Sequence, residues 1–146
     1  MLKFMRSLAA FARGGTTGLQ PLEMHVLSAI GHTLDEGMAA RLSARIQSIN
    51  LVQRLDGGRE VNTYAMAGGK PSFDDHNRMT ATDGEAKLAD FFFTSTDGRR
   101  FEGSAWLVNG QLFSLEFDNP TEHILNEFPN DLRVVSASDL SDRVRL

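Results

Sequence analysis

Residues 86–118 hold three strand-like runs, separated by Asp97-Gly98 and by Asn109-Gly110. Asn-Gly and Asp-Gly both favour the type I′ turn, because both central residues of that turn need a positive φ. Such a turn joins neighbouring antiparallel strands. The stretch therefore predicts a three-stranded antiparallel meander, and no other feature constrains the architecture of this chain as strongly.

Residues 21–50 have the periodicity of two helices. Pro21 suits a first helical position, and Glu23 lies where the helix dipole favours an acid. Gly31 is expected to end the first helix in the left-handed conformation, and residues 33–36 form a capping box that begins the second. Each helix carries one apolar stripe, made by Leu22, Val26, Leu27, Ile30 and Leu34 in the first and by Met38, Leu42, Ile46 and Ile49 in the second.

Three further segments complete the expected order of elements. A β-hairpin is predicted over residues 50–66, with its turn at residues 56–58 (Asp-Gly-Gly). Residues 67–85 are rich in Gly, Asp, Thr and Asn and predict a long loop, which in a compact domain is either mobile or functional. Residues 119–120 (Asn-Pro) are expected to begin a short helix, and residues 132–136 to add a last strand.

Together these elements predict one α+β domain spanning residues 1–146. An N-terminal helical hairpin is expected to pack on a curved antiparallel sheet of about five strands. Residues 1–20 precede the hairpin as a basic segment and linker, with Lys3, Arg6 and Arg13 and no acid.

The meander also predicts which side chains share a face. If Asn109-Gly110 is a two-residue loop, Val108 pairs with Gln111 and Trp106 pairs with Phe113, and directly paired residues lie on one side. One side is then expected to carry Trp106, Val108, Phe113, Leu115 and Phe117, and the other Gly103, Ala105, Leu107, Leu112, Ser114 and Glu116. The first, bulkier side is expected to pack against the helical hairpin.

The second side is expected to need a cover of its own. Phe92 points opposite to Phe91 and Phe93, so apolar side chains occupy both faces of the sheet. The cover is expected to be the amino-terminal segment, the carboxy-terminal segment or another subunit. A two-fold dimer is the commonest solution, so we expect a homodimer with Leu107 or Leu112 in its interface.

Composition excludes several classes of protein. The 146 residues carry a net charge of −4, which argues against nucleic acid as a partner because phosphate binding needs a clustered basic face. The absence of cysteine excludes disulfides and thiolate metal sites, and fits a reducing compartment. No apolar stretch approaches the ~20 residues of a membrane span, and a cytoplasmic protein is expected.

Ionisable residues give few candidates for chemistry, and neither a metal nor a cofactor is predicted. His25 and His32 lie two helical turns apart, about 10.5 Å, too far to share one metal ion. Adjacent Asp74, Asp75 and His76 rarely converge on one ion unaided. Glu116, Asp118, Glu122 and His123 form the densest cluster, which is explained better by a helix start than by acid–base catalysis. The candidate binding residues are Leu107, Leu112, Phe92, Glu116, Asp118 and His123.

A helical pair followed by REVNTY and GSAWLVNGQLFSLEF resembles small bacterial α+β proteins of uncharacterised families, over about residues 21–120. The resemblance implies no particular activity. Some bacterial immunity proteins have a similar size, acidity and α+β composition, and the plan of a curved sheet with helices is similar to the cystatin-like and NTF2-like folds. The function expected first is non-catalytic protein interaction or self-association. The alternative is a small-molecule binder or enzyme with a pocket between helices and sheet.

Overall fold

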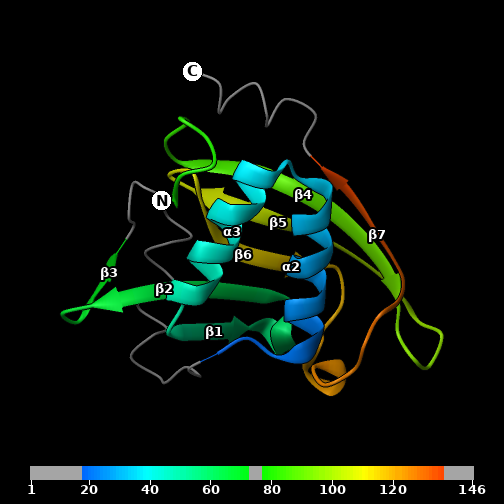
Figure 1. Ribbon diagram of the computed structural model, residues 1–146. Coiled ribbons are helices and arrows are strands. Elements are labelled where there is room, and N and C mark those ends of the chain that lie inside the picture. The colour runs from blue at the N-terminus through cyan, green and yellow to red at the C-terminus, as the bar shows by residue number, and fades with distance from the viewer. Residues whose placement is uncertain (1–17, 73–76, 137–146) are drawn as a thin grey trace.

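The computed structural model describes residues 18–72 and 77–136. Two α-helices pack on a seven-stranded antiparallel sheet, which confirms the expected α+β class, with more strands than the five predicted (Figure 1). The elements are α2 (Pro21–Thr33), α3 (Glu36–Ser48), β1 (Leu51–Leu55), η1 (Asp56–Gly58), β2 (Glu60–Ala67), β3 (Lys70–Ser72), β4 (Glu85–Thr94), β5 (Arg100–Val108), β6 (Gln111–Phe117), η3 (Glu122–Ile124) and β7 (Asn130–Ser136). None of the described helices has the length and apolarity to cross a membrane.

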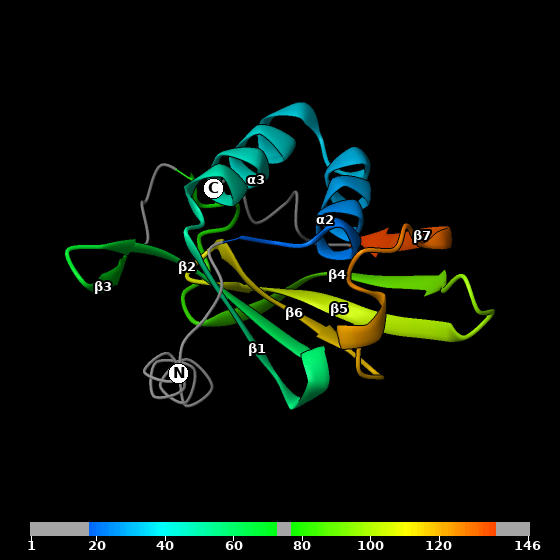
Figure 2. The same cartoon turned by 90° about the horizontal axis from the view of Figure 1, so that it is seen from below.

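The strands lie in the order β1-β2-β6-β5-β4-β7, and β3 pairs with β2. Seen from below, α2 and α3 both lie on one side of the sheet (Figure 2). We call this side the inner face and the opposite side the outer face. The extra strand β3 comes from the segment predicted to be a loop, because Lys70–Ser72 folds back along β2.

The first helix starts with the chemistry that the sequence predicts, whereas its end and the cap of the second helix differ. Pro21 is the first residue of α2, and the Gln20 backbone N–H donates to Glu23 Oε1 at 2.8 Å. The helix continues past Gly31 to Thr33, so the expected end at Gly31 is wrong. Asp35, rather than Thr33, caps α3 by accepting a hydrogen bond from the Met38 backbone N–H at 2.8 Å.

The turn between β5 and β6 has the expected geometry. Asn109 and Gly110 have φ values of 50° and 80°, and Val108 pairs with Gln111. The connection between β4 and β5 differs, because Gly98 has a positive φ and Asp97 does not. A positive φ at one residue only is incompatible with a type I′ turn.

The predicted facing of the meander is wrong beyond that turn. The register shifts by one residue between Trp106 and Leu107, so Trp106 lies opposite Ser114 instead of Phe113. A one-residue shift moves side chains to the other face of a sheet. Leu107 and Leu112 therefore lie in the inner core with exposed fractions of 0%, whereas Trp106 is half-buried on the outer face.

The inner core fills the space between the helices and the sheet. Its centre is aromatic: the Phe93 and Phe101 rings stack 5.0 Å apart, and the Phe91 ring meets Phe117 edge-on at 5.3 Å. Gly103 pairs with Phe91, and a Cβ at this position would overlap the Phe91 ring. The helices contribute Leu22, Val26, Leu27, Ile30, Met38 and Leu42.

Two buried charged residues join the helices to the sheet. The Glu23 carboxylate on α2 is fully buried and accepts hydrogen bonds from Arg54 of β1 at 2.5 and 2.7 Å. Arg45 on α3 donates to the carbonyl oxygens of Leu112 at 2.9 Å and Thr63 at 3.4 Å. Burial lowers the pKa of Arg45 to about 10, so it remains charged at neutral pH.

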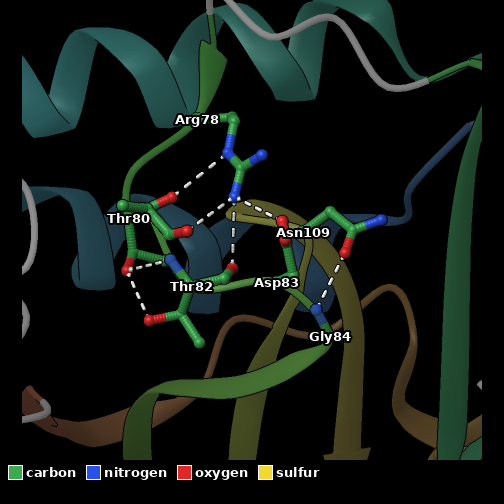
Figure 3. A network of polar contacts seen from close by, with 7 residues as sticks. Arg78, Thr80, Thr82, Asp83, Gly84 and Asn109 are labelled. Atoms are coloured by element: carbon green, nitrogen blue, oxygen red, sulfur yellow. Dashed lines mark hydrogen bonds and ion pairs between the residues drawn. The ribbon is translucent and has the colours of Figure 1, made fainter.

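The described part of the predicted long loop is organised around Arg78 (Figure 3). The Arg78 side chain donates to the Thr80 carbonyl oxygen at 3.2 Å and to Asp83 Oδ1 at 3.0 Å. The Gly84 backbone N–H donates to Asn109 Oδ1 at 2.8 Å, which joins this segment to the β5–β6 turn. The Asp74-Asp75-His76 candidate lies outside the described residues.

The segment after β6 does not start a helix at Asn119 as predicted. The short η3 begins at Glu122, and Thr121 precedes it. Thr121 is buried, and its polar groups are satisfied. Its hydroxyl donates to the Gly58 carbonyl oxygen at 3.0 Å, and its backbone N–H donates to the Gly57 carbonyl oxygen at 3.0 Å. The last strand, β7, forms where the sequence indicates one.

Candidate functional site

The outer face carries an apolar zone at one end, which we call the outer cluster. It consists of Tyr64, Val108 and Phe113, each with an exposed fraction of 1%, and Leu51 and Met66 pack against it. The Tyr64 and Phe113 rings meet edge-on with their centroids 5.6 Å apart. These residues come from four neighbouring strands, β1, β2, β6 and β5.

Next to this zone, the outer face is hollowed into an acidic cleft of about 410 Å³. Four carboxylates line it together with the Phe92 ring and the Ser104 hydroxyl. The cleft residues are Asp90, Phe92, Glu102, Gly103, Ser104, Glu116, Phe117 and Asp118. Strands β4, β5 and β6 lie side by side here, so residues distant in the sequence meet through cross-strand pairing.

Cross-strand register places the cleft residues. Asp90 pairs with Ser104, and Ser104 pairs on its other side with Glu116. Phe92 pairs with Glu102 one step further along the same face. Asp118 follows β6 directly, and its Oδ1 accepts a hydrogen bond from the Glu102 backbone N–H at 3.0 Å.

Asp90 is held as a carboxylate. The Ser104 hydroxyl donates to Asp90 Oδ1 at 2.6 Å, and Lys87 Nζ lies 3.1 Å from the same oxygen. The Ser104 hydrogen bond chiefly lowers the pKa of Asp90, and Lys87 lowers it further against an opposing desolvation. A general acid at neutral pH needs a raised pKa, so Asp90 supplies negative charge in place of a transferable proton.

The negative charge continues beyond the cleft to β2. Glu60 lies directly opposite Glu116 in the β2–β6 pair. Two like charges facing each other across a sheet destabilise the fold. The Asn62 side-chain amide offsets part of this cost, because it donates a hydrogen bond to Glu60 Oε2 at 2.8 Å.

Trp106 stands between the outer cluster and the cleft. Lys87 Nζ lies 5.4 Å from the centre of its ring, within the range of a cation–π interaction. The indole N–H of Trp106 is enclosed and has no hydrogen-bond partner among the described residues. An enclosed donor of this kind costs free energy unless an acceptor reaches it.

The structure brings together three of the six candidate binding residues. Phe92, Glu116 and Asp118 all line the acidic cleft. Leu107 and Leu112 are fully buried in the inner core, so no partner contacts them while the chain is folded. His123 lies exposed on η3, away from the cleft-lining residues.

His123 instead lies near the β4–β5 connection. The pKa of Asp97 is lowered chiefly by a hydrogen bond from the Ser95 hydroxyl, and the charge of His123 adds a smaller contribution in the same direction. No group of three or more potential metal ligands converges anywhere in residues 18–72 and 77–136.

Sequence reasoning missed Asp90, Glu102 and Ser104. The alternation along β4 and β5 contains the signal, because residues two apart share a face. Finding them required the register between β4 and β5, and that register has a bulge between Lys87 and Ala89.

A second hollow of about 390 Å³ lies in the helical layer, between α2 and α3. Leu27 and Leu42 are its buried residues, and Met24 is an exposed one. It contains no acidic or basic side chain other than His32. This groove therefore lacks the charge that would orient a ligand.

Comparison with protein families, with curated proteins and with solved structures gives no match to this chain.

Proposed function

We propose that this chain is a non-catalytic binding domain whose outer face holds a basic, partly apolar segment of a partner protein. The observation that carries the proposal is the acidic cleft of about 410 Å³ on strands β4, β5 and β6. Its four carboxylates are arranged to attract Lys or Arg side chains.

The neighbouring side chains suit the rest of such a segment. Phe92 offers apolar and aromatic surface in the cleft, where an Arg or Lys side chain gains a cation–π contact. The enclosed indole N–H of Trp106 is a donor for a backbone carbonyl oxygen of the incoming segment. A volume of this size holds one or two side chains, which fits recognition of a short stretch.

A second copy of the chain is the alternative partner, giving a homodimer of about 32 kDa, twice the 16.1 kDa chain. Because Leu107 and Leu112 are buried, such a dimer would use the outer face and not those two residues. An immunity-like role, in which an acidic face neutralises a basic protein, is one case of the same proposal.

The other alternative is a small-molecule binder or an enzyme. The space between helices and sheet is filled by the inner core, so a ligand would use the acidic cleft or the α2–α3 groove. In the cleft, the lowered pKa of Asp90 favours binding of a cation over acid catalysis.

The test uses a short peptide of alternating Arg and Leu, with a Glu-for-Arg counterpart, titrated by calorimetry. We expect the basic peptide to bind and the acidic one not to bind, with affinity falling as salt rises. Glu102→Gln removes one cleft charge and should weaken binding about fivefold to tenfold, equivalent to ~1 kcal/mol.

The matched control is Glu36→Gln, which removes one exposed charge from the first turn of α3, in the helical layer. It should leave the affinity unchanged. Equal weakening by both variants would reduce the effect to net charge and would contradict a specific role for the cleft. Failure of the basic peptide to bind would contradict it as well.

A further inference from the structure

The outer cluster is enclosed, although both described helices lie on the opposite face of the sheet (Figure 2). Tyr64 and Phe113 are each 99% buried, and their polar neighbours Gln53, Asn62 and Gln111 are buried too. Large side chains on an uncovered sheet face would expose much of their surface to water. A second layer therefore covers this part of the outer face.

We propose that residues 1–13 of the same chain form that layer and act as an internal ligand of the outer face. This inference rests on the proposed function, because both assign a basic and partly apolar occupant to one surface. The segment MLKFMRSLAAFAR has both properties, with Lys3, Arg6 and Arg13 and no acid.

Charge complementarity supports this occupant. The outer face presents Glu60, Asp90, Glu102 and Glu116, and the segment carries three basic residues. Its apolar side chains, Leu2, Phe4, Met5, Leu8 and Phe11, match the outer cluster. Opposite charges across a surface fix the register of two partners in addition to attracting them.

Reach also supports it. The carbonyl oxygen of Gly18, where the described chain begins, accepts a hydrogen bond from Arg54 of β1 at 3.5 Å. Strand β1 carries Leu51, which packs against the outer cluster. Arg54 lies on the inner side of the sheet, but β1 stands at one end of the strand order, so the chain can pass around this edge. Residues 14–17 span up to about 14 Å, enough to bring residue 13 to the outer face beside β1.

The carboxy-terminal residues 137–146 suit this position less well. They follow Ser136 of β7, which lies at the other end of the strand order from β1. Two Asp residues balance their two Arg residues, so they lack the net positive charge that the outer face attracts.

An internal ligand changes how a partner binds. The covalent link gives residues 1–13 a high effective concentration at the outer face. An external segment must then displace them, which lowers its apparent affinity by the fraction of molecules whose face is open. The amino-terminal segment thus regulates the site to which it binds.

The direct test places a spin label on the full chain. Because the chain has no cysteine, Ala9→Cys gives one labelling site. We expect the label to broaden the amide signals of Tyr64 and Phe113 in a nuclear magnetic resonance spectrum. The control label at Glu36→Cys, on the helical layer, should leave those two signals sharp.

A mixture of isotope-labelled chain and spin-labelled, unlabelled chain identifies the source of the layer. Sharp signals in the mixture are expected, because the segment acts within its own chain. Broadening that occurs only between different chains would assign the layer to a second copy and overturn the inference. Unbroadened Tyr64 and Phe113 signals in the singly labelled chain would overturn it too.

The regulatory step is tested by reversing the charge of the segment with Lys3→Glu, Arg6→Glu and Arg13→Glu together. If the segment occupies the face in nine of ten molecules, the Arg–Leu peptide should bind this variant about tenfold more tightly. The conservative control, Arg6→Lys with Arg13→Lys, should keep the original affinity. An unchanged affinity in the reversed variant would contradict regulation by the segment.

These outcomes separate the two proposals. Binding of the peptide without broadening of Tyr64 and Phe113 supports the proposed function and overturns the internal ligand. Broadening of both signals, with no peptide binding even in the charge-reversed variant, supports the internal ligand and overturns the proposed function.

Discussion

At the scale of single residues, Asp90 shows how a neighbour sets the charge of the cleft. Its carboxylate lies on a sheet face, where Ser104 donates a hydrogen bond at 2.6 Å. A hydrogen bond to the ionised form favours that form and lowers the pKa. The cleft therefore keeps this negative charge throughout the neutral pH range.

Ser104→Ala should raise the pKa of Asp90 toward its ordinary value of 3.8. The lowered pKa means that ionised Asp90 stabilises the fold above pH 3.8, and that this contribution disappears as the pH falls through the lower, folded value. Carboxyl chemical shifts recorded during an acid titration measure the change. A pKa that stays low in the variant would show that Lys87 alone holds the charge.

At the scale of elements, the Asn109-Gly110 turn could be predicted, whereas the turn type at Asp97-Gly98 and the facing of the strands could not. The residue pair Asn109-Gly110 favours its turn because both residue types readily adopt a positive φ. This preference is local, so the sequence alone predicts it. The face on which a side chain lies is predicted by counting residues from the turn. The bulge after Trp106 shifts the register by one residue, so this count gives the wrong face. Nothing local in the sequence marks that bulge.

The same reason explains what could be predicted of the candidate site. Phe92, Glu116 and Asp118 stand out as apolar or acidic residues near strand ends. Ser104 and Glu102 acquire a role only through their partners on β4 and β6, which are set by register. Cross-strand partners depend on tertiary structure, so a sequence pattern alone does not reveal them.

The β5–β6 turn also carries a contact that tests its link to the preceding loop. Gly110 has a φ of 80°, and a Cβ there would lie 2.5 Å from the Thr80 carbonyl oxygen. Gly98 has a similar φ of 86° with no atom within 4 Å. Gly98→Ala should therefore cost ~1 kcal/mol from backbone strain, and Gly110→Ala should cost more.

Urea unfolding measures the two free energies of unfolding, with Gly98→Ala as the matched control for strain. Equal losses would mean that the segment around Thr80 moves away from the turn without cost. That result would contradict the close packing of the loop against Gly110.

At the scale of the whole molecule, the two faces of the sheet differ in composition. The inner face holds the stacked phenylalanines and the helices, and the outer face holds the carboxylates and Trp106. Stability should therefore depend mainly on inner-face residues, and binding on outer-face residues.

Phe93→Ala and Trp106→Ala test that division. Phe93 is 2% exposed in the inner core, so its removal should cost ~3–5 kcal/mol. Trp106 is half-buried, so its removal should cost less, although the side chain is larger. Thermal unfolding compares the stability of the two variants. A greater loss of stability in Trp106→Ala than in Phe93→Ala would contradict the assignment of the main core to the inner face.

The pairing of β2 with β6 has a consequence for how the chain reaches this structure. Thr63 and Phe113 are joined by a hydrogen bond across 50 positions of sequence, whereas β1–β2 and β5–β6 are local hairpins. Closing so long a loop costs entropy before any contact offsets it. The hairpins can form early and independently, and the seam between them becomes the slow step of folding. Arg45 spans this seam, with hydrogen bonds to Thr63 on one side and Leu112 on the other. Breaking the β2–β6 pairing requires breaking these hydrogen bonds, so Arg45 should slow unfolding of the joined state.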